Sequence, residues 1–130
     1  MSDLTRSMGA AASGMQAQSA RLRLSAENVA NADTPGYRRK TVPFEAVRDL
    51  SADVEKVSVG PVRLDRSDLE QVYDPSHPLA DDSGHYKGSN VDLMIEIADA
   101  REAQRSYEAN LKMFEQGRQM SSSLMDLLRR

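Results

Sequence analysis

The sequence predicts a mainly α-helical chain, with long N- and C-terminal helices pairing as a coiled-coil-like hairpin and a small β-hairpin and loop insertion between them. Apolar residues recur at helical spacing towards both ends of the 130 residues. The middle alternates apolar with polar residues and then becomes rich in Pro, Asp, Ser and Gly. Aromatic residues make up only 5% and Trp is absent, so large side chains for a globular core are scarce.

The N-terminal helix is expected over residues 1–31. One apolar row recurs at every seventh position, which holds one face of a helix towards a partner helix: Met8, Met15, Leu22 and Val29. A second row begins at Leu4 and Ala11 and is interrupted by Gln18 and Ser25. Gly9 and Gly14 each weaken an isolated helix by about 1 kcal/mol relative to Ala. This helix therefore needs a partner to be stable.

A turn and basic segment is expected over residues 32–45. Pro35 disfavours helical geometry at Thr34, so the helix has to end before it. Pro followed by Gly36 suits a type II turn, whose third residue has a positive φ. Asn31 is a residue type that suits the end of a helix. From local chemistry alone, an ordinary surface loop is the favoured interpretation.

Three consecutive cations, Arg38, Arg39 and Lys40, follow this turn. No aromatic residue beyond Tyr37 is interleaved with them for base stacking, and acidic residues lie nearby in sequence. The net charge of −3 also argues against nonspecific nucleic-acid binding. We therefore expect a solvated charge cluster or salt bridges between subunits rather than a nucleic-acid site.

The middle segment, residues 46–90, is predicted to hold small β elements and loops. VEKVSVGPVRLD alternates apolar and polar residues around Gly60-Pro61, which predicts two short strands joined by a tight turn. Residues 69–73 predict a third strand. The composition of residues 73–90 predicts a long loop.

The C-terminal helix is expected over residues 91–130, with Ser89 or Asn90 as its N-cap. Apolar and small residues step by three or four along it, and four of them are expected in the seam with the first helix: Tyr107, Leu111, Phe114 and Leu124. A helix of about 40 residues would be roughly 55–60 Å long. That length exceeds the width of a compact domain of this size.

Several classes of function find no support in the sequence. Without Cys there is no disulfide and no thiolate ligand or nucleophile. No GxSxG or P-loop motif is present, so we assign no catalytic, cofactor-binding or metal-binding residue. His77 and His85 match no zinc spacing, although a small metal-dependent enzyme using them stays open as an alternative. No cleavable secretory signal and no apolar run of about 18 residues is visible.

Two motifs carry a resemblance to a known family. ENVANADTPGYRRK (residues 27–40) and RSYEANLKMFEQGRQM (residues 105–120) resemble the N- and C-terminal signatures of the rod subunits of the bacterial flagellar basal body. VYDPSHPLADDSGHYKGSNVD (residues 72–92), the short length and the RRK followed by Phe44-Glu45 are similar to the proximal rod proteins of that family. The resemblance covers nearly the whole chain.

The resemblance implies a structural protein with no enzymatic activity. Such a subunit would leave the cell through the flagellar type III export apparatus without a cleaved signal peptide. It would polymerise through its terminal helices into the rod that crosses the periplasm and transmits motor torque to the hook. Implied partners are further copies, other proximal and distal rod subunits, the base of the basal body and the export gate, with neither nucleic acid nor direct membrane insertion.

The corner between the first helix and the middle segment is implied to be an assembly motif, made of Asn28, Asn31, Thr34, Pro35, Gly36, Tyr37, Arg38, Arg39 and Lys40. Two alternatives remain beside the enzyme named above. One is another flagellar axial subunit. The other is a cytoplasmic helical export chaperone, which would be a self-sufficient helical bundle, whereas a rod subunit is expected to order its termini only in the polymer.

Overall fold

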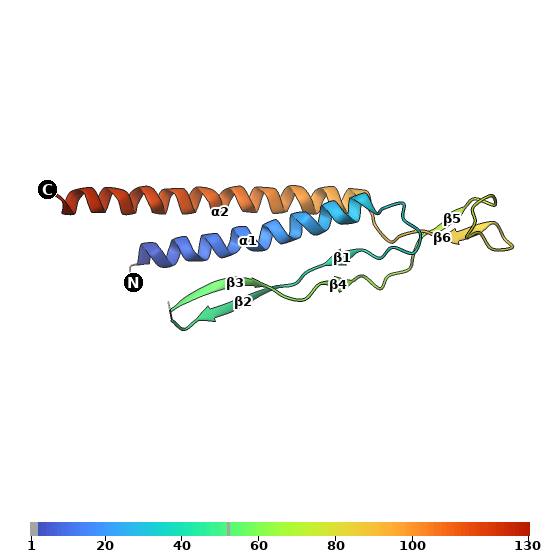
Figure 1. Cartoon of the computed structure of the whole chain (residues 1–130), viewed down its shortest axis with the longest axis horizontal. Coiled ribbons are helices and arrows are strands. Elements are labelled where there is room, and N and C mark those ends of the chain that lie inside the picture. The colour runs from blue at the N-terminus through green and yellow to red at the C-terminus, as the bar shows by residue number, and fades with distance from the viewer. Residues whose placement is uncertain (1–2, 52) are drawn as a thin grey trace.

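The computed structural model describes residues 3–51 and 53–130 and shows an elongated molecule. Helix α1 (Asp3–Ala30) and helix α2 (Leu93–Leu128) lie side by side and antiparallel, so the two chain ends lie at the same end of the molecule (Figure 1). A long β ribbon covers the side of α1 that faces away from α2. The predicted pair of long terminal helices with a small β insertion is confirmed.

The start of α2 differs from the prediction. Asp92 is the N-cap, and its carboxylate accepts a hydrogen bond from the backbone N–H of Met94 at 3.0 Å. The expected caps have other roles: the hydroxyl of Ser89 donates to the carbonyl of Ala32, and the side-chain amide of Asn90 donates to the carbonyl of Asp65, just after the last strand of the ribbon. Both side chains therefore hold the preceding loop against the rest of the chain.

Small residues form the most buried part of the helix pair: Ala11, Gly14 and Ala17 in α1, with Ala103 and Gly117 in α2. A Cβ added at Gly14 would lie 2.8 Å from the side-chain amide nitrogen of Asn110, and one at Gly117 would lie 2.7 Å from Cγ of Met8. The two backbones therefore approach closely at the glycines, which only a residue without a side chain permits.

The apolar rows expected in the seam are only partly covered. Met8 lies against Gly117, and Met15 and Tyr107 line one shallow surface hollow. Leu22, Leu111 and Phe114 are half-buried. Val29 is 43% exposed and Leu124 is 55% exposed. The buried line of α1 runs instead through the small and polar row, where Ser25 is buried.

The middle of the chain forms one long antiparallel ribbon in two parts. Strand β2 (Phe44–Asp49) pairs with β3 (Val54–Val59), and β1 (Lys40–Thr41) pairs with β4 (Arg63–Leu64). Between the two parts, residues 42–43 lie opposite residues 60–62, so the ribbon contains a one-residue bulge.

The prediction that Gly60-Pro61 forms the turn of a hairpin is wrong. The chain passes straight through this point, and the turn lies between β2 and β3. Gly60 donates its backbone N–H to the carbonyl of Pro43 at 2.9 Å. A Cβ at Gly60 would lie 2.7 Å from Cγ of Pro43, so the glycine is needed for close approach of the strands.

A second, separate hairpin projects from the end of the molecule opposite the chain termini (Figure 1). Strand β5 (Gln71–Tyr73) pairs with β6 (His85–Lys87), so the predicted third strand is present but two residues shorter at its start. The segment expected as one long loop is the tip of this hairpin together with β6. Asp74 and Asp81 organise its turns by accepting hydrogen bonds from Ser76 and Ser83.

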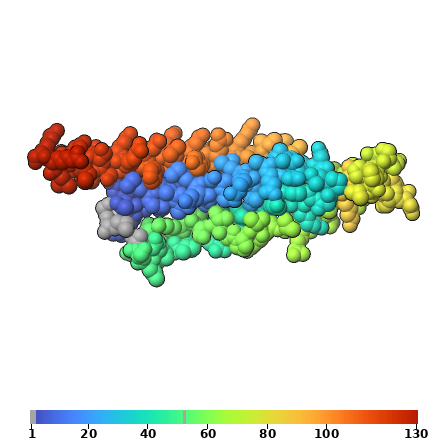
Figure 2. Space-filling view, in the orientation of Figure 1, coloured from blue at the N-terminus to red at the C-terminus, as the bar shows by residue number. Residues whose placement is uncertain are grey.

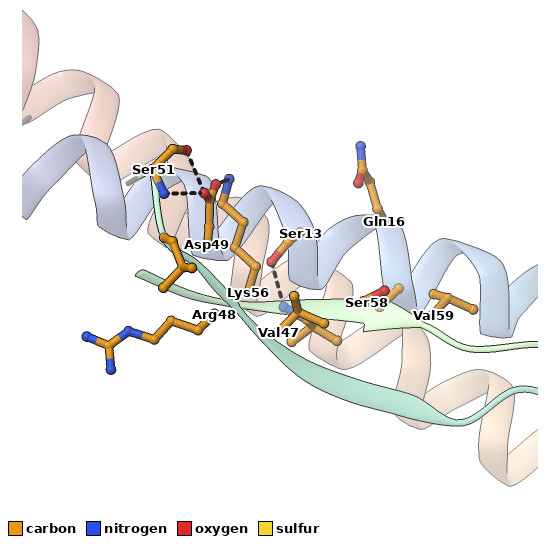
Figure 3. A pocket seen from close by; sticks show the side chains of 12 residues that line it. Ser13, Gln16, Val47, Arg48, Asp49, Ser51, Lys56, Ser58 and Val59 are labelled. Carbon is orange, nitrogen blue, oxygen red and sulfur yellow. Dashed lines mark hydrogen bonds and ion pairs between the residues drawn. The ribbon is translucent and has the colours of Figure 1, made fainter. Parts of the chain in front are cut away.

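An open groove of about 740 Å³ lies between α1 and the β2–β3 hairpin. The hydroxyl of Ser13 accepts a hydrogen bond from the backbone N–H of Val57 at 3.1 Å, which fixes β3 to the helix (Figure 3). Arg48 points away from the helix, whereas Asp49, Ser51 and Lys56 form a polar cluster at the hairpin end.

We expect the end of this hairpin to lose order in acid. Hydrogen bonds from the Ser51 hydroxyl at 2.6 Å and from Lys56 at 3.0 Å lower the pKa of Asp49 to about 2. The unfolded value is about 3.9. The carboxylate therefore stabilises the hairpin above about pH 4 and loses this effect as the pH falls towards about 2. The protection of the Val54 and Lys56 amides relative to their intrinsic exchange rates should fall over that range, and Asp49→Asn should remove the dependence.

Candidate functional site: the corner between the helices

The corner begins with a turn that has the geometry expected from its sequence. Gly36 has a φ of 77°, and the backbone N–H of Tyr37 donates to the carbonyl of Thr34 at 3.1 Å. A positive φ after a proline is the geometry of a type II turn. The N–H of Gly36 also donates to the carbonyl of Gly88 at 3.0 Å. The turn is therefore attached to the segment between β6 and α2.

Asn28 is the centre of the corner and is only 1% exposed. Its side-chain NH₂ donates to the carbonyl of Lys40 at 2.9 Å and to Oε1 of Glu96 at 3.2 Å. Its side-chain oxygen accepts from the backbone N–H of Lys40 at 2.9 Å and from the Tyr37 hydroxyl at 2.8 Å. Both ends of the amide are thus satisfied, and one side chain joins α1, β1 and α2.

A network of four charges surrounds this asparagine. Glu96 of α2 is fully buried at 0% exposure and accepts a hydrogen bond from Nε of Arg39. Another guanidinium nitrogen of Arg39 contacts Asp99 at 2.6 Å, and Arg21 of α1 contacts the other oxygen of Asp99 at 3.2 Å. The cations come from α1 and the β ribbon, and the carboxylates come from α2. The network therefore connects all three layers of the molecule.

The electrostatics favour the ionised cations. Burial alone would lower the pKa of Arg39, but the hydrogen bond and charge of Glu96, together with Asp99, raise it above its ordinary value. The pKa of Lys40 is raised by its hydrogen bond and ion pair with Glu27. Burial raises the pKa of Tyr37, with the charge of Glu27 acting in the same direction. Tyr37 therefore stays a neutral hydrogen-bond donor at neutral pH.

The structure places each of the three expected cations in contacts within the chain. Arg38 donates to the carbonyls of Asp65 and Ser67 at 3.2 and 3.0 Å. Asn90 donates to the same carbonyl of Asp65 at 2.9 Å and accepts from the backbone N–H of Arg39 at 2.6 Å. Arg38 and Asn90 thus hold the returning chain after β4 against the corner.

The remaining expected residues lie on the outer side of the turn. Asn31 donates its side-chain NH₂ to the carbonyl of Glu27 at 2.9 Å and accepts from the Thr34 hydroxyl at 3.1 Å. Pro35 and Gly36 are exposed. Seven residues of the expected assembly motif therefore contribute side-chain hydrogen bonds to the corner, and Pro35 and Gly36 shape its turn.

Sequence reasoning missed the acidic half of the network. Glu96 stands between Ile95 and Ile97 in a short apolar run, and a single carboxylate in such a run is a signal for a buried ion pair. Its partner, however, is 57 residues away in sequence. No local pattern identifies that partner.

The cavity at the corner is small. The cavity beside Arg39 and Glu96 has a volume of about 60 Å³, about twice the share of one water molecule in the liquid. The ring of His77 stacks on that of Tyr86 with 3.9 Å between the ring centroids, and the ring centroids of His85 and Tyr73 are 5.1 Å apart. Within residues 3–51 and 53–130, His, Asp and Glu form no group that could hold a metal ion. The side chains of the corner are instead suited to connecting α1, α2 and the β ribbon.

Outside the corner, large apolar side chains are exposed along the molecule. On α2 they gather at its two ends, with Leu93, Met94 and Ile97 near its start. Phe44, Val57 and Val59 lie exposed on the β2–β3 hairpin. Figure 2 shows the three layers as one extended slab, in which the end of α2 projects beyond the rest. Among the described residues, no helix is long and apolar enough to cross a membrane.

Comparison with known proteins gave concordant matches. Residues 8–38 match the family model described as flagella basal body rod protein, and residues 82–127 match the one described as flagellar basal body rod FlgEFG protein C-terminal. The chain is similar to the flagellar basal-body rod protein FlgC of Agrobacterium fabrum, with 46% identity over 99% of this chain and 98% of the relative.

Two relatives of lower identity give the same result. The FlgC protein of Aquifex aeolicus is 37% identical over 88% of this chain and 89% of its own length. That of Escherichia coli O6:H1 is 38% identical over 79% of this chain and 81% of its own length. The likeness therefore includes the middle of the chain, which the two family models leave uncovered.

Proposed function

We propose that the chain is a structural subunit of the proximal rod, because it belongs to the flagellar basal-body rod protein family and is FlgC-like along its whole length. It polymerises through its terminal helices with copies of itself and with other rod subunits. The resulting shaft crosses the periplasm, stands on the base of the basal body and the export gate, and transmits torque from the motor to the hook. The chain reaches this position through the type III export apparatus without a cleaved signal.

The exposed apolar surface of the helix pair is the observation that supports assembly. Monomeric proteins rarely expose large contiguous apolar patches. Here Met120, Leu124 and Leu127 of α2 are each more than half exposed. A neighbour that covers these side chains would gain about 25 cal/mol for each Å² of apolar surface removed from water. This also argues against a chaperone that is complete as a single bundle.

The corner supports the transmission of torque. A shaft subunit has to keep its helices and its outer β ribbon in fixed relative positions under load. The joint described above connects all three layers through buried hydrogen bonds and ion pairs, with Asn28 and Glu96 at its centre. We propose that its role is to keep the angle between these layers constant.

Deletion and complementation test the proposed function. We expect a strain without this chain to be non-motile, to lack rods and hooks, and to regain both with the wild-type sequence. Basal bodies isolated from the complemented strain should contain the chain. Motile deletion cells with complete basal bodies would contradict the proposal, as would a chain found only in the cytoplasm together with export substrates.

Gly36→Val is expected to impair rod assembly while leaving synthesis of the chain intact. No heavy atom lies within 4 Å of an added Cβ among the described residues, so the effect arises from the backbone. The φ of 77° costs a residue with a side chain about 1–2 kcal/mol, and most for a β-branched one. Gly36→Asn, which tolerates positive φ, is the matched control. Normal rods and motility in the valine variant would show that the turn geometry is dispensable.

A further inference from the structure

The two ends of the molecule carry different exposed apolar side chains. At one end, α2 continues beyond the start of α1, and we call residues 118–128 with Arg129 and Arg130 the overhang (Figure 1). At the opposite end projects the β5–β6 hairpin, and we call residues 74–84 its tip. Because the ends differ, a contact between them joins the front of one copy to the back of the next.

The overhang continues a face of α2 that α1 covers elsewhere. Ala103, Asn110 and Gly117 recur at every seventh position, and each is buried or half-buried on the side of α1. The next residue in this row is Leu124, which is 55% exposed. An added Cβ at Gly117 would still lie 3.7 Å from Leu4, close to where α1 begins. Beyond that point the described part of α1, which begins at Asp3, no longer covers this row.

The tip, at the opposite end of the molecule, also exposes apolar side chains. Leu79 is 63% exposed and Tyr73, at the end of β5, is 67% exposed. The overhang presents Met120, Leu124 and Leu127 at 53, 55 and 61% exposure. Each set is small by itself, but both would be removed from water if one covered the other.

The charges of the two surfaces are complementary. The tip contains Asp74, Asp81 and Asp82 and no Lys or Arg. Hydrogen bonds from Ser76 and from Ser83 lower the pKa of Asp74 and of Asp81, so both stay ionised. The overhang contains three arginines and one aspartate: Arg118, Arg129, Arg130 and Asp126. Opposite charges at the rim of an apolar contact favour the correct partner and orientation.

We propose that the tip of the β5–β6 hairpin of one copy docks on the overhang of α2 of a second copy. The inference rests on the proposed function and specifies one contact within the polymer. The two surfaces are different and lie at opposite ends, so after docking the first copy keeps its overhang free and the second keeps its tip free. Such a heterologous contact does not close on itself and propagates along the long axis of the molecule.

Disulfide crosslinking in isolated basal bodies tests this contact. The wild-type chain has no Cys, so it gives no background from its own thiols. We expect the double variant Leu79→Cys and Leu127→Cys to give a ladder of dimers and larger oligomers after mild oxidation, whereas each single variant gives no ladder. The matched control combines Leu127→Cys with Leu50→Cys at the end of the β2–β3 hairpin, where Leu50 is 87% exposed.

The outcomes separate this inference from the proposed function. Basal bodies that contain the double variant but give no ladder would overturn the contact and leave the rod function intact. A ladder from the control pair would place the overhang on the β2–β3 hairpin instead. Capture of a different protein by Leu127→Cys would show that the overhang serves another partner. If the chain is absent from basal bodies, both the proposed function and this inference are contradicted.

Charge reversal provides a second measurement that needs no crosslink. Asp82→Arg and Arg130→Asp should each reduce swimming, because each places like charges at the contact. The two together should restore it towards the wild-type level. If the double variant swims no better than the worse of the two single variants, that result would contradict a direct contact between tip and overhang.

Discussion

Glu96→Ala is expected to lower the free energy of unfolding by about 3 kcal/mol, because removing one member of a buried ion pair leaves the other without compensation. Glu96 is fully buried and contacts both Arg39 and Asn28. The alanine variant leaves the guanidinium, which is 20% exposed, with Asp99 as its remaining carboxylate partner. Because that partner persists, we expect the lower part of the usual 3–5 kcal/mol range.

Glu102→Ala is the matched control for this prediction. Glu102 is also on α2 and pairs with Arg21 at 3.3 Å, but its side chain is 68% exposed. Exposed ion pairs contribute about 0.2–1 kcal/mol, so this variant should unfold at nearly the wild-type urea concentration. Urea unfolding followed by helical circular dichroism measures both. Equal midpoints for Glu96→Ala and Glu102→Ala would show that the corner network does not stabilise the helix pair.

The double variant Glu96→Leu with Arg39→Met distinguishes pairing from packing. Replacing both members of a buried pair by apolar residues of similar size is often nearly neutral. We therefore expect the double variant to be more stable than Glu96→Ala, while the connection between the β ribbon and α2 becomes less specific. A double variant that is stable but does not form rods would show that the network serves the geometry of the joint rather than folding.

The parts of the fold that sequence reasoning predicted correctly depend on local physics. The two helices follow from apolar spacing along a single segment, and the turn follows from the restrictions that Pro35 and Gly36 place on their own backbones. For the same reason the positive φ of Gly36 could be predicted from two residues. The length of each helix needed no knowledge of its neighbours.

The parts that were missed depend on residues far apart in sequence. Gly60-Pro61 has the composition of a turn, but its place is set by contact with Pro43, which a single segment does not reveal. The seam residues on α1 were expected to be the large ones, yet Val29 is exposed and Ser25 is buried. The close approach of two backbones favours small residues at the contact, and periodicity of large apolar residues alone does not detect that.

In the candidate site, too, the residues close together in sequence were predicted and the distant ones were missed. Asn28 and the cations after Tyr37 were assigned to one motif because the family signature that the chain resembles includes all of them within 13 consecutive residues. The carboxylates that complete the network come from α2 and are brought to the corner only by the antiparallel pairing of the helices. These partners within the chain could not be identified from the local sequence, and contacts of the same cations with neighbouring subunits stay a prediction.

Gly14→Val should destabilise the helix pair by about 2 kcal/mol through overpacking, which typically costs about 1–3 kcal/mol. The first atom added at Gly14 would lie 2.8 Å from the side-chain nitrogen of Asn110 and 3.0 Å from its carbon Cγ. Asn110 cannot move aside freely, because its NH₂ group donates to the carbonyl of Ser106 at 3.0 Å. Val forms helices only slightly better than Gly, so propensity offsets only a few tenths of a kcal/mol of this cost.

Gly9→Val is the same substitution five positions earlier on α1 and separates packing from backbone effects. A Cβ at Gly9 would lie 3.7 Å from Cε of Lys56, an ordinary contact with the end of a mobile side chain. We expect its unfolding free energy to stay within about 0.5 kcal/mol of the wild type. If both variants unfold at the same urea concentration, the close approach of α1 and α2 at Gly14 contributes nothing. If only Gly14→Val is destabilised, the rod subunit depends on a glycine contact that holds its two helices at a fixed distance.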